Sequence, residues 1–597
     1  MQAVILAAGM GRRLGKYTKE VPKGLVEVGG KALLEHALDE LAGRIDRAVL
    51  VIGYHGEKVK EKIGDNYGGI PIEYIVNEDY ETTNNIYSLW LASGKMTEDD
   101  TILLESDVIF EKGIIDKLME EEGEAVAVVH KFEDWMDGTV VLLDDEGCIT
   151  SFISGDSISW SDKDSYYKTV NIYRFSKGFF KKHYLPFLRA YIESQGYSHY
   201  YENVLAVIVG IKKIKIKALV VDGMKWYEID TPEDLHNARV LFSKPPEKLS
   251  LLKEMYGGYW RFPHILDFCY LVTPHFPPTG LIDEMKSSFE ELLRGYPSGR
   301  SMVKTLLSMN FGVDEKHITA ANGASEIIRV LPEILEGRFG IILPTFEEYP
   351  NRISKERQVR KIADGDGFRY DISLVEELFN EVENVVLVNP DNPSGNFIEV
   401  GEILKLLERL PEGKRLILDE SFVDFAEDGR SLIDEEVLED HGNLLVIKSI
   451  SKSYGVPGLR LGVVATSDED LLKSIEKRLP IWNINSFAEK FLQILRKYRK
   501  DYERACEILR EDRKVFIERL SKIEGLRVFP SQANFVLCEL GDMSSTELAL
   551  RLAEKDIFIK DCSGKLGMGN KYVRFSIRTR DENERLIEAL EEVIGRI

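Results

Sequence analysis

The chain has 597 residues, of which 44% are hydrophobic and 30% are charged, so it is long enough for several domains and too apolar to be disordered. Its net charge of −23 argues against a basic face for nucleic acid, and no stretch approaches the ~20 apolar residues that a membrane span needs. The five cysteines are scattered without a CxxC pair, which indicates a reducing compartment. We therefore expect a cytoplasmic protein with neither nucleic-acid nor membrane partners.

The first part of the chain, residues 1–242, alternates short β-branched runs with amphipathic helical patterns. This alternation is typical of βαβ units and predicts a Rossmann-like α/β domain with a mostly parallel sheet. The helices are predicted at 33–41 and 57–63, and the strands at 3–6, 48–52, 72–76, 101–104 and 125–129.

The second part, residues 259–597, carries another α/β pattern and then, from about Leu509, a smaller α+β subdomain. Residues 243–258 between the two parts contain Pro-Pro and Gly-Gly pairs, which cannot continue a helix, so we expect a linker there. The two parts share no motif, which indicates a fusion. The main strands of the second part are predicted at 339–343, 385–388, 415–418 and 444–447.

A glycine-rich loop follows the first predicted strand. Its backbone N–H groups suit a polyphosphate, and basic side chains nearby would neutralise it. A dinucleotide fingerprint would need glycine where Leu14 stands, and there is no Walker motif. The run from Leu6 to Leu14, with Pro22 and Lys23, resembles the nucleotidyltransferases that act on sugar and alcohol phosphates. The resemblance implies a catalytic Lys23 and a nucleotide site made of Leu6, Ala8, Gly9, Gly11, Arg13 and Lys23.

Acidic residues follow two later strands, in Glu105-Ser-Asp107 and Glu228-Ile-Asp230. Nucleotidyl transfer needs a divalent cation, and hard cations prefer carboxylate oxygens. The resemblance implies that Asp107 and Asp230 bind the catalytic Mg²⁺, and Glu228 is a further candidate ligand on the same strand face as Asp230. Alternatively, Asp230 caps the helix that begins near Pro232.

The segment from Thr82 to Leu89, which contains Asn85 and Tyr87, resembles the phosphocholine and related cytidylyltransferases. This resemblance implies CTP as the nucleotide, a small amino-alcohol phosphate or aminophosphonate as the acceptor, and Asn85 and Tyr87 in its site. A quaternary ammonium favours an aromatic cage, whereas a primary ammonium also needs oxygen acceptors. The available side chains are Trp135, Trp160, Tyr173, Tyr201 and Trp226 for a cage, and Asp134, Asp137 and Asp156 as acceptors.

The second part of the chain contains a lysine among hydroxyls and glycines, Ser449-Ile-Ser451-Lys452, followed by Arg460. Such a lysine suits a covalent bond to a phosphorylated cofactor. Further segments accompany it in chain order: a helix start at Ala324-Ser325, an aromatic residue at Tyr349, an amide at Asn392, a strand-end acid at Asp419 and an arginine at Arg574.

These segments resemble the fold-type I aminotransferases of the histidinol-phosphate branch, including their threonine-phosphate decarboxylase relatives. The resemblance implies that Lys452 binds pyridoxal 5'-phosphate, that Asp419 pairs with its ring nitrogen and that Asn392 binds its ring oxygen. Tyr349 would stack on the ring and Arg574 would bind the substrate carboxylate. The cofactor phosphate would lie among Ala324, Ser325, Ser449, Ser451 and Arg460.

Tyr296 resembles the tyrosine that reaches the cofactor of the neighbouring subunit, which implies a homodimer. One departure concerns the reaction. The family usually has tyrosine three residues after the aspartate, where this chain has Phe422, and the decarboxylase relatives tolerate phenylalanine there.

Taken together, the chain resembles the bacterial 2-aminoethylphosphonate cytidylyltransferase–transaminase fusions. The resemblance implies transamination of phosphonoacetaldehyde by an amino donor, which leaves as a keto acid, and then transfer of CMP from CTP. Three alternatives stay open: another small phosphorylated metabolite, a decarboxylase in the second half, or one half that binds without catalysis.

Overall fold

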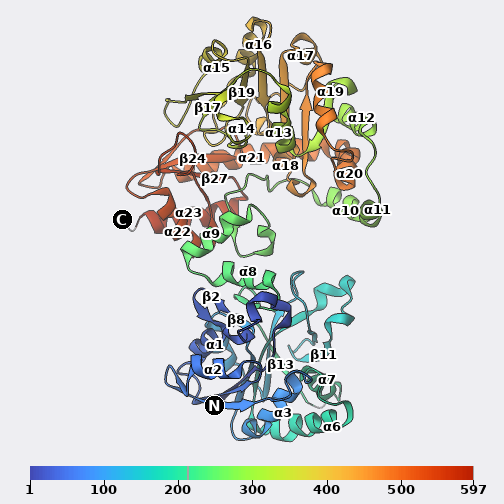
Figure 1. The fold of residues 1–597 in the computed structure, drawn as a ribbon, viewed down its shortest axis with the longest axis vertical. Coiled ribbons are helices and arrows are strands. Elements are labelled where there is room, and N and C mark those ends of the chain that lie inside the picture. Colours follow the sequence, from blue (N-terminus) through green and yellow to red (C-terminus); the bar gives the residue numbers. More distant parts are fainter. Residues whose placement is uncertain (212–213, 596–597) are drawn as a thin grey trace. The chain divides into compact units, whose positions relative to one another are not determined.

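The computed structural model describes residues 1–211 and 214–595, and its chain divides into two compact units, Met1–His264 and Ile265–Ile597. Each unit is an α/β structure, with helices placed around a central sheet (Figure 1). The predicted fold class is confirmed. Within the described ranges, no helix is long and apolar enough to cross a bilayer.

The first unit is built on a ten-stranded sheet. Five of its strands match the predicted runs: β1 (Gln2–Ala7), β4 (Arg47–Ile52), β6 (Ile70–Val76), β7 (Thr101–Glu105) and β9 (Ala125–Lys131). The first four are parallel neighbours. Next to β7 lies β12 (Tyr167–Phe175), which runs antiparallel to β7 and β9, so the sheet is more mixed than predicted.

Helices cover both faces of this sheet. Side chains alternate along β1, with Ala3 and Ile5 packing on one face and Val4 and Leu6 on the other. One face is covered by α1 (Leu33–Leu41), α2 (Gly56–Ile63) and α4 (Gly113–Glu120). The other is covered by α3 (Asn85–Met96), α6 (Leu185–Gln195) and α7 (Glu202–Gly210).

Residues 243–258, which we expected to be a linker, contain helix α9 (Pro245–Met255). The two prolines stand in its first turn, where a missing N–H leaves no hydrogen bond unmade. The expectation that this pair marks non-helical chain was wrong. Helix α9 contacts α8 (Pro232–Phe242) within the first unit and ends at Tyr256, which has φ of 51°.

The second unit has a seven-stranded sheet in the order β16-β22-β21-β20-β19-β17-β18. All neighbours are parallel except β22 (Leu461–Ala465), which is antiparallel to both of its neighbours. The other strands are β16 (Ile318–Asn322), β17 (Phe339–Leu343), β18 (Gln358–Ile362), β19 (Asn384–Val388), β20 (Arg415–Asp419) and β21 (Leu444–Ser449). Strands β17, β19, β20 and β21 match the predicted runs.

The end of the chain forms a small antiparallel sheet in the order β23-β24-β27-β26. Its strands are β23 (Leu526–Val528), β24 (Phe535–Leu540), β26 (Lys560–Asp561) and β27 (Tyr572–Ser576). Helices α21 (Arg499–Leu520), α22 (Ser545–Glu554) and α23 (Arg580–Ile594) accompany it (Figure 1). This is the predicted α+β subdomain.

Candidate active sites

The glycine-rich loop connects the buried end of β1 at Leu6 to a 3₁₀ turn that begins at Arg12. Gly11 has φ of 58°, and a Cβ atom on it would lie 3.0 Å from Thr18 Cγ2 and 3.2 Å from Lys23 Cβ. Only glycine fits both this conformation and this close approach. Gly9 is exposed, with open space where a side chain would be, so the loop leaves its backbone accessible to a ligand.

Lys23 brings the two predicted metal ligands together. Its Nζ atom lies 2.5 Å from Asp107 Oδ2 and 2.5 Å from Asp230 Oδ1. Arg13 Nη2 lies 2.7 Å from Asp230 Oδ2. Burial lowers the pKa of Lys23, but the attraction of the two aspartates outweighs burial and raises that pKa above its ordinary value. The predicted phosphate loop, basic residues and acids thus form one site.

The alternative that Asp230 caps a helix is wrong. Helix α8 is capped by Thr231, whose hydroxyl accepts from the Asp234 N–H, while the Asp234 carboxylate accepts from the Thr231 N–H. This reciprocal pair leaves the Asp230 carboxylate for Lys23 and Arg13.

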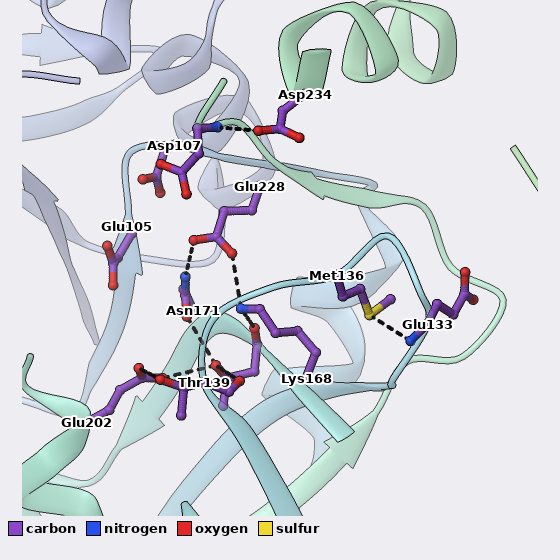
Figure 2. Close-up of polar contacts among 12 residues, drawn as sticks. Glu105, Asp107, Glu133, Met136, Thr139, Lys168, Asn171, Glu202, Glu228 and Asp234 are labelled. Atoms are coloured by element: carbon purple, nitrogen blue, oxygen red, sulfur yellow. Dashed lines mark hydrogen bonds and ion pairs between the residues drawn. The ribbon is translucent and has the colours of Figure 1, made fainter. Parts of the chain in front are cut away.

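The pair Asp107 and Asp230 fits a hard divalent cation. Asp107 Oδ1 is buried and has no hydrogen-bond partner among the described residues, which is the state of an oxygen that awaits a ligand. Glu228 is placed differently, because its two oxygens already accept from Asn171 Nδ2 at 3.1 Å and Lys168 Nζ at 3.0 Å (Figure 2). A metal-binding role for Glu228 therefore stays a prediction.

Beside this pair lie two acids, Glu105 and Glu202, that were not predicted as site residues (Figure 2). Figure 2 shows Glu105, Asp107 and Glu228 around one space, with Glu202 below them. Burial, with the nearby charges of Asp107 and Glu228, raises the pKa of Glu105 well above its ordinary value. The position of Glu105 at a strand end, two residues before Asp107, was the available signal. Glu202, at the start of α7, gave none.

Asn85 belongs to this group. Its Nδ2 atom donates to Glu105 Oε1 at 3.2 Å, and its Oδ1 accepts from the Tyr201 N–H at 3.1 Å. Tyr87 lies elsewhere and contacts Asp79 and Tyr197.

The other side chains proposed for the ammonium do not form one site, although Trp135 contacts Trp226 and Tyr173 contacts Tyr201. Asp134, Asp137 and Asp156 are all exposed, and Asp134 pairs with Lys163. Of the aromatic set, Trp160 is 60% exposed, whereas Tyr173 and Tyr201 are fully buried.

In the second unit, Lys452 lies on the short helix α18 (Ile450–Ser453), directly after β21. Its Nζ atom is 4.5 Å from the centre of the Phe422 ring and 4.9 Å from that of Phe346. Burial lowers the pKa of Lys452 to about 8; Arg574 adds to this effect and Asp419 opposes it. An amine with a lowered pKa is suited to nucleophilic and proton-transfer chemistry.

Asp419, at the end of β20, is buried and oriented by three hydrogen bonds. Its Oδ1 accepts from the Ser421 N–H at 3.0 Å and from the Ser421 hydroxyl at 2.5 Å, and its Oδ2 accepts from the Tyr349 hydroxyl at 2.8 Å. Arg574, which was predicted to bind the substrate carboxylate, donates to Asn392 Oδ1 at 2.6 Å and to the Cys269 carbonyl at 2.6 Å. The predicted cofactor residues are thus held by contacts with one another.

The residues around α13 (Ala324–Ile334) fit the phosphate of the cofactor. Arg460 Nη2 lies 3.4 Å from the Ser325 hydroxyl, and the Ser451 hydroxyl is buried without a partner in the described part of the chain. A Cβ atom on Gly462 would lie 2.3 Å from the Ala324 nitrogen, so β22 approaches the helix start closely. Ser449 is buried at the end of β21. Unpaired donors beside a helix N-terminus suit an anion.

Tyr296 is 80% exposed, and its ring stacks on Trp482 at a centroid distance of 4.4 Å. Its predicted reach into a second subunit stays a prediction.

These folds and sites define an enzyme that joins a nucleotidyltransferase to a pyridoxal-phosphate enzyme of the aminotransferase type. Residues 3–203 match the MobA-like NTP transferase domain, and residues 293–590 match the aminotransferase class I and II family. The CMP-5'-(3-aminopropyl)phosphonate synthase of Streptomyces rubellomurinus is 35% identical over 603 residues, covering 100% of this chain and 95% of that protein. The chain belongs to the same family of fusions as that synthase.

Two further relatives match the second half. The L-serine phosphate decarboxylase of Campylobacter jejuni is 30% identical over 348 residues, covering 55% of this chain and 88% of that protein. The crystal structure of histidinol-phosphate aminotransferase from Clostridium acetobutylicum aligns with a TM-score of 0.52 and 27% identity, covering 56% of this chain and all of that one. The second half is therefore similar both to aminotransferases and to decarboxylases.

Proposed function

We propose that this chain makes an aminoalkylphosphonate and then activates it with CTP. Its C-terminal enzyme converts phosphonoacetaldehyde to 2-aminoethylphosphonate with an amino donor, which leaves as a keto acid. Its N-terminal enzyme transfers CMP from CTP to that product and releases pyrophosphate. The observation that carries this proposal is the full-length similarity to a CMP-aminoalkylphosphonate synthase, and both halves of this chain contain the residues proposed for catalysis, Lys23, Asp107, Asp419 and Lys452.

In the N-terminal enzyme, Asp107 and Asp230 would hold Mg²⁺, which would neutralise charge on the nucleotide phosphates. Lys23 and Arg13 stand beside the glycine-rich loop and supply positive charge to the pyrophosphate as it leaves. The exposed backbone at Gly9 lets the phosphates approach the loop.

In the C-terminal enzyme, bound pyridoxal 5'-phosphate would supply an electron sink for the negative charge that develops at the substrate carbon. Lys452 would hold the cofactor and would move the proton at that carbon, which its lowered pKa favours. Asp419 would keep the ring nitrogen protonated, and Arg574 would bind the acidic group of the substrate.

A panel of acceptors with CTP and Mg²⁺, scored by pyrophosphate release, tests the N-terminal activity. We expect the highest kcat/KM with 2-aminoethylphosphonate. A second candidate is 3-aminopropylphosphonate, which the name of the full-length relative favours. A higher kcat/KM with phosphocholine, phosphoethanolamine or a sugar 1-phosphate would contradict the proposal.

A second candidate reaction for the C-terminal enzyme is decarboxylation of a phosphorylated or phosphonylated amino acid. Two observations favour it: Phe422 occupies the position where aminotransferases of this branch usually have tyrosine, and serine phosphate decarboxylases are among the relatives. Measuring keto acid and CO₂ together separates the two reactions. Keto acid without CO₂ supports transamination, and CO₂ without keto acid supports decarboxylation.

A further inference from the structure

Glu105 lies next to the glycine-rich loop, and its carboxylate accepts few hydrogen bonds. In the parallel pairing of β1 with β7, Glu105 is opposite Leu6, where the loop begins. Glu105 is half-buried, and its carboxylate accepts one hydrogen bond in the described structure, from Asn85 at 3.2 Å. A carboxylate oxygen can accept two hydrogen bonds, so most of the acceptor capacity of Glu105 is unused.

The neighbouring acidic residues differ in whether a positively charged side chain balances their negative charge. Glu228 forms an ion pair with Lys168. Glu202 accepts only from hydroxyl groups, those of Thr139, Thr169 and Tyr173, and forms no ion pair within residues 1–211 and 214–595 (Figure 2). Within the described residues, neither half-buried Glu105 nor buried Glu202 therefore forms an ion pair. Buried charged groups are normally paired with an opposite charge, so these two carboxylates favour a positively charged ligand.

The hydroxyl group of Tyr201 is a second indication, separate from the acids, of the same kind of ligand. Tyr201 is fully buried, and its hydroxyl has no hydrogen-bond partner among the residues that the structure describes. Its backbone is linked to Glu105 through Asn85, which accepts from the Tyr201 N–H and donates to Glu105. Its ring packs edge-on against the Tyr173 ring at a centroid distance of 5.8 Å, and the Tyr173 hydroxyl donates to Glu202, so the Tyr201 ring lies beside these acids.

We propose that Glu105, Tyr201 and Glu202 form the subsite for the primary ammonium group of the acceptor in the N-terminal enzyme. An ammonium has three N–H donors, which match the free acceptor sites of Glu105 and the Tyr201 hydroxyl. Its charge compensates the two carboxylates. The opposite, anionic end of the acceptor then lies toward Lys23 and Arg13, so the site matches a short zwitterion. A trimethylammonium group offers no N–H donor, so the subsite selects against choline compounds.

This inference rests on the proposed function and is tested by acceptor selectivity. The two acceptors are 2-aminoethylphosphonate and 2-hydroxyethylphosphonate, which have equal length and differ in charge. We expect Glu105→Gln to lower the ratio of kcat/KM for the amine to kcat/KM for the alcohol by about 10- to 100-fold, which is what loss of one charged hydrogen bond gives. Asp134→Asn removes an exposed acid that pairs with Lys163, and this control should keep the wild-type ratio.

Tyr201→Phe provides a second variant. Its hydroxyl has no hydrogen-bond partner in the part of the chain that the structure describes, so its removal should leave folding intact and lower the same ratio by about 3- to 10-fold. An unchanged ratio in both variants would overturn the inference. So would a Glu105→Gln variant whose ratio is unchanged while the Mg²⁺ concentration at half activity rises, because Glu105 would then be a metal ligand. Wild-type protein that transfers CMP to no amino acceptor would overturn the proposed function instead.

Discussion

The ammonium of Lys23 lies 2.5 Å from Asp107 Oδ2, so this lysine is paired with an oxygen of a predicted metal ligand. It also contacts Asp230, the second predicted ligand. Lysine and metal therefore compete for the same carboxylates. Nucleotide phosphates would offer Lys23 another partner, so binding of CTP should release the carboxylates to Mg²⁺.

The first prediction follows from this competition. Lys23→Met should tighten Mg²⁺ binding without nucleotide by on the order of tenfold, because a positive charge in contact with both carboxylates is removed. The same change should lower CMP transfer by on the order of 10²-fold or more. Titration calorimetry with Mg²⁺ alone measures the first effect, and Lys31→Met, at an exposed pair with Asp39, is the control. Weaker or equal Mg²⁺ binding by the Lys23 variant would contradict the competition.

The second prediction concerns Asp107. Asp107→Asn replaces a charged metal ligand with a neutral amide and should lower CMP transfer by on the order of 10²-fold or more. The absorption spectrum of bound pyridoxal 5'-phosphate should not change, because Lys452 and Asp419 belong to the other unit. Transfer within a few-fold of wild type would show that Asp107 is not a metal ligand.

The third prediction is a pH dependence. Only the neutral amine of Lys452 can attack the cofactor aldehyde, and burial lowers its pKa to about 8. The neutral fraction increases with pH, so covalent loading of apoprotein should rise about tenfold per pH unit below 8 and level off above it. Stopped-flow absorbance from pH 6 to 9.5 measures this, with Lys452→Ala as the variant that cannot load covalently. A rate that still climbs tenfold per unit above pH 9 would show an ordinary lysine.

Much of the fold was predictable because the strands are buried on both faces. Runs such as 339–343 and 416–418 are continuous apolar segments, and Asp419, the acid that follows the second run, was predicted as a site residue. The helix over 245–255 was missed because Pro-Pro interrupts a helix in its interior but begins one in its first turn.

The acid group around Glu105 was only partly predictable. Glu105 stands at a strand end beside a motif, whereas Glu202 begins a helix about a hundred residues later and meets Thr139 and Tyr173 only through the fold. By contrast, Asp134 and Asp137 looked equally suitable in sequence and are exposed. The spacing of acidic residues along the chain does not predict which carboxylates the fold buries without a neighbouring positive charge.

The fourth prediction concerns Tyr349, whose hydroxyl donates to Asp419 Oδ2. Tyr349→Phe removes one hydrogen bond to a buried carboxylate and should lower the free energy of unfolding of the apoprotein by about 1.5–3 kcal/mol. The loss should be smaller in the loaded protein, because the ring nitrogen of the cofactor then pairs with Asp419. Urea unfolding of both forms measures the difference. Equal losses in both forms would contradict the assigned role of Asp419.

We propose that the two enzymes on this chain act in sequence on one aminophosphonate. The most direct measurement follows ³¹P resonances while the full chain is given phosphonoacetaldehyde, an amino donor, CTP and Mg²⁺, in parallel with Lys452→Ala. We predict that the wild type forms the CMP-aminophosphonate, and that the variant forms it only when 2-aminoethylphosphonate is added. Formation of the product from the aldehyde by the variant, or its absence in the wild type supplied with 2-aminoethylphosphonate, would contradict the account.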